Sequence, residues 1–155
     1  MHWSAGEDEN QVDDKAHYHF IVTRWGDIVK GNFTPEDNLN TKDGTYAAHT
    51  FMMNTGSIGV AMDAMKGAVE RPFYAGPEPI TDVQVEAFCK FIAGLLKKYG
   101  IPLSGKTCLT HAEVQPVLGV KQKGKWDITW LPGMTKPGDP VSVGNILRYK
   151  IKGYM

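Results

Sequence analysis

The stretch that decides the fold is Thr81–Tyr99, which reads TDVQVEAFCKFIAGLLKKY. Thr81 and Gln84 have the spacing of a capping box, so we expect a helix to begin there. Gly100 and Pro102 follow the stretch, and both are typical of a helix end. The apolar residues recur at three- and four-residue spacing and form one stripe that must pack on a flat partner: Val83, Ala87, Phe88, Phe91, Ile92, Leu95, Leu96 and Tyr99.

The flat partner is supplied by short apolar runs that precede the helix. His19–Thr23 reads HFIVT, and Ile28–Lys30 reads IVK. Gly26 lies between these runs and supplies the positive φ that a tight hairpin needs. Ser57–Met62 reads SIGVAM, and an apolar run without charge is typical of a buried strand. These patterns predict a sheet with the long helix on one face.

The remaining segments complete the expected organisation. We expect a surface loop over Glu7–His17, one or two helical turns over Ala47–Met53, a second buried strand over Lys106–His111 and a terminal helix over Val143–Tyr149. Strands that alternate with helices indicate the α/β class. The prediction is a single domain over residues 1–155, with a central mixed β-sheet flanked by helices.

Composition excludes several classes of function. The 155 residues carry 17 basic and 17 acidic side chains, so the net charge is zero. A protein that grips nucleic acid usually has a basic excess, and a polybasic membrane-surface protein does too. Two cysteines, Cys89 and Cys108, are too few for a disulfide scaffold and are expected to be free thiols rather than a bridge. The N-terminal residues lack the features of a signal peptide, which predicts synthesis in the cytoplasm.

Histidine is the residue type with the most chemical potential in this chain. There are five, and no H-E-x-x-H or C-x-x-C motif accompanies them: His2, His17, His19, His49 and His111. Any single histidine is more often a surface or hydrogen-bonded imidazole than a metal ligand. His2 and His111, however, lie at the ends of predicted strands, and Asp127 follows sixteen residues after His111. Ends of strands are where α/β sheets place ligands.

Four segments carry a resemblance to a known family, and they occur in the family's order. They are His2-Trp3-Ser4-Ala5, then Tyr18–Val22 with Arg24-Trp25-Gly26, then Ala48-His49 with Asn54 and Ser57–Val60, and finally Thr110–Val114 with Lys125 and Asp127. In these segments the chain resembles the zinc-dependent N-acetylmuramoyl-L-alanine amidases of the type-2 amidase family. That family includes phage endolysins and is similar in fold to peptidoglycan recognition proteins.

The resemblance implies a set of zinc ligands and neighbouring site residues. His2, His111 and Asp127 match the ligands of a Zn²⁺ ion, and Asp127 stands where some phage members have cysteine. Lys125 matches a lysine near the scissile carbonyl. Tyr18 matches a tyrosine that lines the catalytic cleft.

Two more residues are assigned to substrate binding on the same resemblance. His49 matches a histidine of the cleft floor, and Trp3 adjoins the first ligand. His19 points away from Tyr18 if both lie on one strand, so we expect it to be structural. His17 is expected to be exposed.

Some roles stay open at the level of sequence. Lys125 lies near Lys121 and Lys123, so it is either a solvated lysine or an oxyanion donor. Tyr18 either packs at the edge of the sheet or acts in the cleft. Glu113 is either a general base or a structural carboxylate. Ala61 occupies a place where several bacterial members carry glutamate; this departure is more similar to the phage enzymes and leaves the general base unassigned.

The expected function is hydrolysis of the amide between N-acetylmuramic acid and L-alanine by a phage or prophage endolysin. The expected partner is peptidoglycan, and we expect a monomer without membrane insertion that reaches the periplasm or cell wall through holin-type release. The alternative is a protein of the same fold that binds muropeptides without cutting them, and Asp127 argues against it. A third possibility is an α/β domain that binds no metal.

Overall fold

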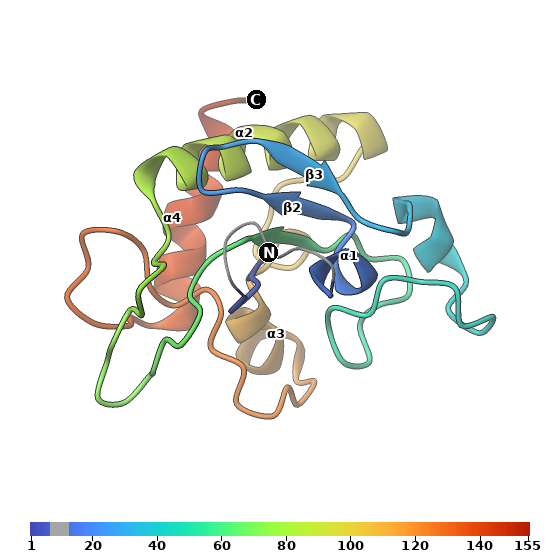
Figure 1. Cartoon of the computed structure of the whole chain (residues 1–155). Coiled ribbons are helices and arrows are strands. Elements are labelled where there is room, and N and C mark those ends of the chain that lie inside the picture. The colour runs from blue at the N-terminus through green and yellow to red at the C-terminus, as the bar shows by residue number, and fades with distance from the viewer. Residues whose placement is uncertain (7–12) are drawn as a thin grey trace.

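The long helix is present as predicted. The computed structural model describes residues 1–6 and 13–155, and α2 spans Asp82–Tyr99 (Figure 1). Thr81 accepts a hydrogen bond from the Gln84 N–H, and the Gln84 side chain accepts one from the Thr81 N–H. Gly100 ends the helix at a φ of 64°, the left-handed conformation that glycine adopts without steric cost.

The buried face of α2 differs from the predicted stripe at its first turn. Val83 is exposed, and Gln84 is fully buried in its place. The Gln84 amide donates hydrogen bonds to the carbonyls of Val22 and Asp63, at 2.9 and 3.1 Å. A polar side chain therefore joins the helix to the ends of two strands, and periodicity of apolar residues cannot reveal this contact.

The described residues form a four-stranded mixed sheet in the order β1-β4-β2-β3. Its strands are β1 (His2–Trp3), β2 (Phe20–Val22), β3 (Ile28–Lys30) and β4 (Val60–Met62). β4 is parallel to both β1 and β2, whereas β2 and β3 form the predicted antiparallel hairpin. Gly26 makes its turn at a φ of 89°. The predicted α/β class with a central mixed sheet is confirmed.

The register of the strands gives the sheet two distinct faces. His2 pairs with Ala61, which pairs with Ile21, so these three side chains share one face. The next row points to the opposite face and belongs to the hydrophobic core with Phe88 of α2: Trp3, Met62 and Val22. The sheet therefore buries one face against α2 and turns His2 to the other.

In the part of the chain that the structure describes, three further helices and one 3₁₀ helix surround the sheet. They are α1 (Asp14–His17), η1 (Pro35–Leu39), α3 (His111–Leu118) and α4 (Pro140–Lys152). α4 confirms the predicted terminal helix and packs on both α2 and α3; Figure 1 shows it in red, to the left of the strands and crossing behind α2. Both cysteines are buried and free. Within the described ranges, no helix has the length and apolar character needed to cross a membrane.

Three local predictions were wrong. Residues 106–110 form no strand, and α3 begins at His111, because Thr110 and Glu113 form a capping box that satisfies the first N–H groups of a helix. Ala47–Met53 forms turns without a helix. The loop predicted over Glu7–His17 contains α1, while its residues 7–12 lie outside the described residues.

Candidate metal centre

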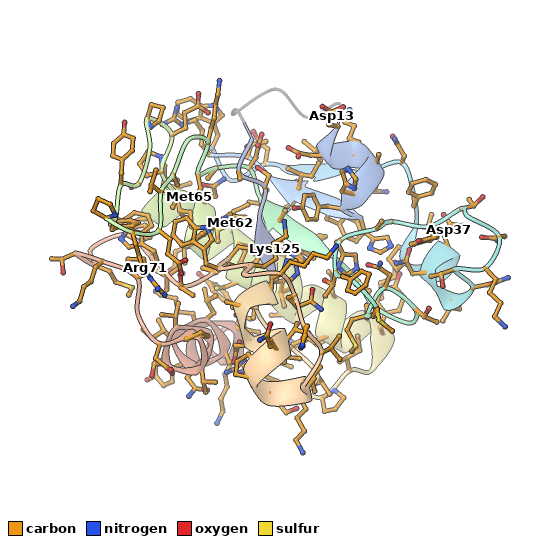
Figure 2. The ribbon with its side chains drawn as sticks, turned by 90° about the horizontal axis from the view of Figure 1, so that it is seen from below. Asp13, Asp37, Met62, Met65, Arg71 and Lys125 are labelled. Carbon is orange, nitrogen blue, oxygen red and sulfur yellow. The ribbon has the colours of Figure 1, made fainter. Side chains whose placement is uncertain are left out.

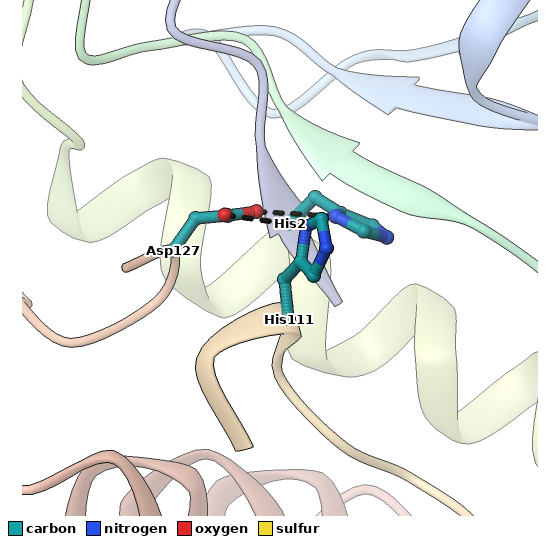
Figure 3. A group of neighbouring side chains, drawn as sticks. All are labelled: His2, His111 and Asp127. Atoms are coloured by element: carbon teal, nitrogen blue, oxygen red, sulfur yellow. Dashed lines mark hydrogen bonds and ion pairs between the residues drawn. The ribbon is translucent and has the colours of Figure 1, made fainter. Parts of the chain in front are cut away.

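Three segments that are distant in sequence bring His2, His111 and Asp127 together (Figure 3). His2 comes from β1, His111 is the first residue of α3, and Asp127 lies in the loop that follows α3. All three are buried, with exposed fractions of 2%, 7% and 6%. Each offers one ligand atom, and these atoms lie within 4.8 Å of one another.

Backbone hydrogen bonds hold the three segments in this arrangement. The His111 N–H donates to the carbonyl of Met1 at 3.0 Å, which ties the start of α3 to β1. The Ala112 N–H donates to the carbonyl of Asp127 at 2.6 Å, which ties the same turn to the loop. These amides belong to the first turn of a helix, where N–H groups have no partner within the helix. The start of α3 is therefore the point from which the cluster is organised.

The distances within the cluster fit a metal ion. His2 Nδ1 lies 3.1 Å from Asp127 Oδ2, and His111 Nδ1 lies 3.4 Å from Asp127 Oδ1. Ligand atoms bound tetrahedrally to zinc at about 2.1 Å are separated by about 3.4 Å. Two imidazoles and one carboxylate are also a ligand set that leaves a fourth position for water in catalytic zinc sites.

Protonation states in the cluster favour the same interpretation. Burial lowers the pKa of His2 to about 3, so this imidazole is neutral at pH 7. Burial acts to raise the pKa of Asp127, but the side chains of His111 and His2 outweigh it and hold this pKa well below its usual range. Metal ligands must be neutral imidazoles and ionised carboxylates, and His2 and Asp127 meet that requirement.

The comparisons with known proteins agree with the site. The sequence profile described as N-acetylmuramoyl-L-alanine amidase (Amidase_2) matches residues 1–134. This chain belongs to the N-acetylmuramoyl-L-alanine amidase family. Neither the curated proteins nor the solved structures gave a match. Family membership supports peptidoglycan amidase activity, and the match includes all three members of the cluster.

Tyr18 adjoins the cluster of this amidase. Its ring centroid lies 5.2 Å from that of His2, with an angle of 49° between the ring planes. Burial raises the pKa of the Tyr18 phenol, and the negative charges of Asp127 and Asp14 add to the shift. The phenol therefore keeps its proton at neutral pH and can donate a hydrogen bond.

His49 contacts a ligand histidine directly. Its Nδ1 lies 3.2 Å from His2 Nε2 and 2.8 Å from the Thr50 hydroxyl. Burial lowers the pKa of His49, so this ring is neutral as well. Its Nε2 is buried and has no hydrogen-bond partner among the described residues. The ring lines a cavity of about 350 Å³ that also borders His2 and His111.

Lys125 and Trp3 lie in opposite environments. Lys125 is exposed and precedes Asp127 by two residues; Figure 2 shows it in the centre of the view from below. Trp3 is only 5% exposed and packs edge-on against Trp126, with ring centroids 4.7 Å apart. Trp3 therefore presents almost no surface to a substrate, because it lies one residue beyond His2 and faces the core.

The other two histidines lie apart from the ligands, as expected. His19 is 1% exposed; it accepts a hydrogen bond from the Gly59 N–H and contacts the Asn38 side chain at 2.8 Å. His17 is exposed. Glu113 is fully buried and forms an ion pair with Arg148, so its carboxylate has a structural partner.

One polar residue of the site was missed from the sequence. Gln122 lies in the segment between α3 and Asp127, and it is 3% exposed. Its side chain contacts His111 Nε2 at 2.8 Å. No motif marks it, and a glutamine in a lysine-rich loop is ordinarily a surface residue.

Proposed function

We propose that this chain is a zinc-dependent hydrolase that cleaves the amide bond between N-acetylmuramic acid and L-alanine in peptidoglycan. The observation that carries the proposal is the buried cluster of His2, His111 and Asp127, with Nδ1-to-carboxylate distances of 3.1 and 3.4 Å. Buried charge of this kind needs a partner. The family to which the chain belongs supplies the reaction, and the cluster supplies residues suited to hold zinc.

Zinc in such a site would polarise the amide carbonyl and lower the pKa of water to about 7. The chain's own residues would hold and orient the reacting groups. The Tyr18 phenol, which keeps its proton, is placed beside His2 to donate to the substrate or to orient water. The Lys125 ammonium would stabilise negative charge on the carbonyl oxygen. His49, whose Nε2 is unpartnered among the described residues, would contact the substrate from the cavity that it lines.

We further propose that the enzyme is a phage or prophage endolysin. Ala61 supports this role, because it stands where several bacterial members carry glutamate. It is fully buried and pairs in register with His2, so this place adjoins a proposed zinc ligand. In this respect the chain is more similar to the phage enzymes. Without a carboxylate there, Tyr18 and Lys125 are the polar groups suggested by the phage enzymes. Release to the wall by a holin would follow from this role.

Analysis of digested peptidoglycan by mass spectrometry tests the proposed reaction. We expect free peptides that begin with L-alanine, together with intact glycan strands. Purified protein should contain about one zinc ion per chain, and His111→Ala should abolish both zinc binding and lysis. Cleaved glycan would point to a muramidase, and metal-free protein that still cleaves the wall would exclude the zinc mechanism. Binding of muropeptides without any cleavage would favour a recognition protein.

A further inference from the structure

Gln122 contacts two different parts of the candidate metal centre with one side chain. Its Oε1 lies 2.8 Å from His111 Nε2, and its Nε2 donates to the carbonyl of Phe51 at 2.8 Å. The residue is 3% exposed, so water does not replace these partners. Its backbone N–H is held separately, by the side-chain oxygen of Gln115 at 3.1 Å.

The chemistry of these contacts fixes the orientation of the amide. A backbone carbonyl can only accept, so the atom of Gln122 facing Phe51 must be the NH₂ group. The other atom is then the carbonyl oxygen, which can only accept a hydrogen bond, so His111 Nε2 must be its donor. His111 therefore carries a proton on Nε2. With zinc bound, the neutral ring would then offer the lone pair on Nδ1 to the metal; Nδ1 lies 3.4 Å from Asp127 Oδ1.

The contact to Phe51 extends the influence of Gln122 to the other ligand histidine. Phe51 follows His49 and Thr50, and both of these side chains contact His2 Nε2, at 3.2 and 3.4 Å. Asn54 holds the same segment by accepting from the backbone N–H groups of His49 and Thr50. One amide thus joins the His111 ring to the segment that supports His2.

We propose that Gln122 is a positioning residue of the metal centre. It selects the Nε2–H tautomer of His111, aims Nδ1 at the metal position, and holds residues 49–51 against His2. The inference rests on the proposed zinc site. Partners of this kind are commonly worth 10- to 100-fold in metal affinity, because they fix the tautomer and the orientation of the ligand ring.

Two variants separate the contacts. Gln122→Met keeps the length of the side chain and removes both partners, so zinc affinity should fall 10- to 100-fold in competition with a chelator. Gln122→Glu keeps an acceptor for His111 Nε2 but loses the donor to Phe51, so it should restore most of the affinity. Hydrogen exchange of the amides in residues 49–54 should become faster in both variants.

The proton on His111 Nε2 can be observed without metal. Nitrogen-15 NMR of the metal-free protein should show His111 Nε2 fully protonated in wild type and in Gln122→Glu, and only partly protonated in Gln122→Met. Gln115→Met is the matched control, because it loosens the same loop while leaving the Gln122 side chain in place. It should keep wild-type zinc affinity and wild-type protonation of His111 Nε2.

The outcomes distinguish this inference from the proposed function. If wild type binds zinc and Gln122→Met binds it equally well, the positioning role is excluded while the zinc site stands. If Gln115→Met weakens binding as much as Gln122→Met, loosening of the loop explains the effect and the role is also excluded. If wild type binds no zinc, the proposed metal centre fails, and the inference fails with it.

Discussion

The carboxylate of Glu113 and the guanidinium of Arg148 form a buried, two-point ion pair between α3 and α4. Arg148 Nη1 donates to Glu113 Oε1 at 2.9 Å, and Nη2 donates to Oε2 at 2.8 Å. Glu113 Oε1 also accepts from the Thr110 N–H at the start of α3. The carboxylate therefore caps the helix that presents His111 and anchors the same turn to α4.

Breaking this pair on one side should destabilise the whole fold. Glu113→Gln leaves the Arg148 charge buried without its counter-ion, and we expect a loss of about 3–5 kcal/mol in the free energy of unfolding. Urea denaturation measures it. The double variant Glu113→Leu with Arg148→Met should recover most of the loss, because neither charge then stays unpaired. A double variant no more stable than Glu113→Gln would mean that the ion pair is not the origin of the loss.

Two helical glycines provide a second test of the same contact. A Cβ on Gly144 of α4 would overlap the Glu113 carboxylate, whereas a Cβ on Gly94 of α2 would meet nothing within 4 Å. Gly94→Ala should stabilise the protein by up to about 1 kcal/mol through helix propensity. Gly144→Ala should instead lower the melting temperature, because the carboxylate must move away from Arg148. Equal effects of the two substitutions would contradict this packing.

The sequence predicted those elements whose signals are local. α2 has both a periodic apolar stripe and a capping box, and the β2–β3 hairpin has β-branched runs around Gly26. α3 was missed although Thr110 and Glu113 carry the capping-box spacing, because the preceding apolar run indicated a strand. The capping box was the stronger signal, because it supplies hydrogen-bond acceptors to N–H groups at the start of α3 that have no partner within the helix.

The site was predictable only through the resemblance. Composition and spacing gave no reason to join His2 to Asp127, because they lie 125 positions apart and the residues between them form most of the fold. Gln122 and Arg148 act through partners 11 and 35 residues away, and no periodic pattern specifies such contacts. The assignment of Trp3 to the substrate overlooked strand alternation, which turns the residue after a ligand to the opposite face.

Asp14 should make stability depend on pH in mildly acidic solution. Burial raises the pKa of its carboxyl to about 6, from an ordinary value of 3.8, and the charge of Asp63 adds to the shift. The folded state then binds a proton more tightly than the unfolded state. Stability is therefore highest below about pH 4 with respect to this group, and it falls as the pH rises to 6.

Asp14→Asn should remove this dependence. The carboxyl is only partly buried, so solvent reduces the effect to about 1 kcal/mol at pH 7. Urea denaturation at pH 4, 5, 6 and 7 should show a smaller decline in the variant than in wild type, and higher stability of the variant at pH 7. Asp43→Asn is the matched control, because it removes one exposed charge in a turn far from Asp14 in sequence. Asp139 is also exposed, but it caps α4 and is therefore unsuitable as a control. Parallel curves for wild type and Asp14→Asn would exclude the shifted pKa.

Substitution of Lys125 tests the proposal that its ammonium stabilises negative charge on the carbonyl oxygen of the substrate. Its side chain is exposed and forms no hydrogen bond or ion pair in the described part of the chain, so Lys125→Ala should leave the stability and the zinc content unchanged. If its ammonium stabilises the developing oxyanion, kcat should fall about 10²- to 10³-fold, while KM changes little. Lys121→Ala is the matched control, because Lys121 is an exposed lysine of the same loop. Wild-type turnover in both variants would show that Lys125 is only a solvated surface charge. An equal loss of turnover in both variants would indicate that the loop attracts substrate by its positive charge.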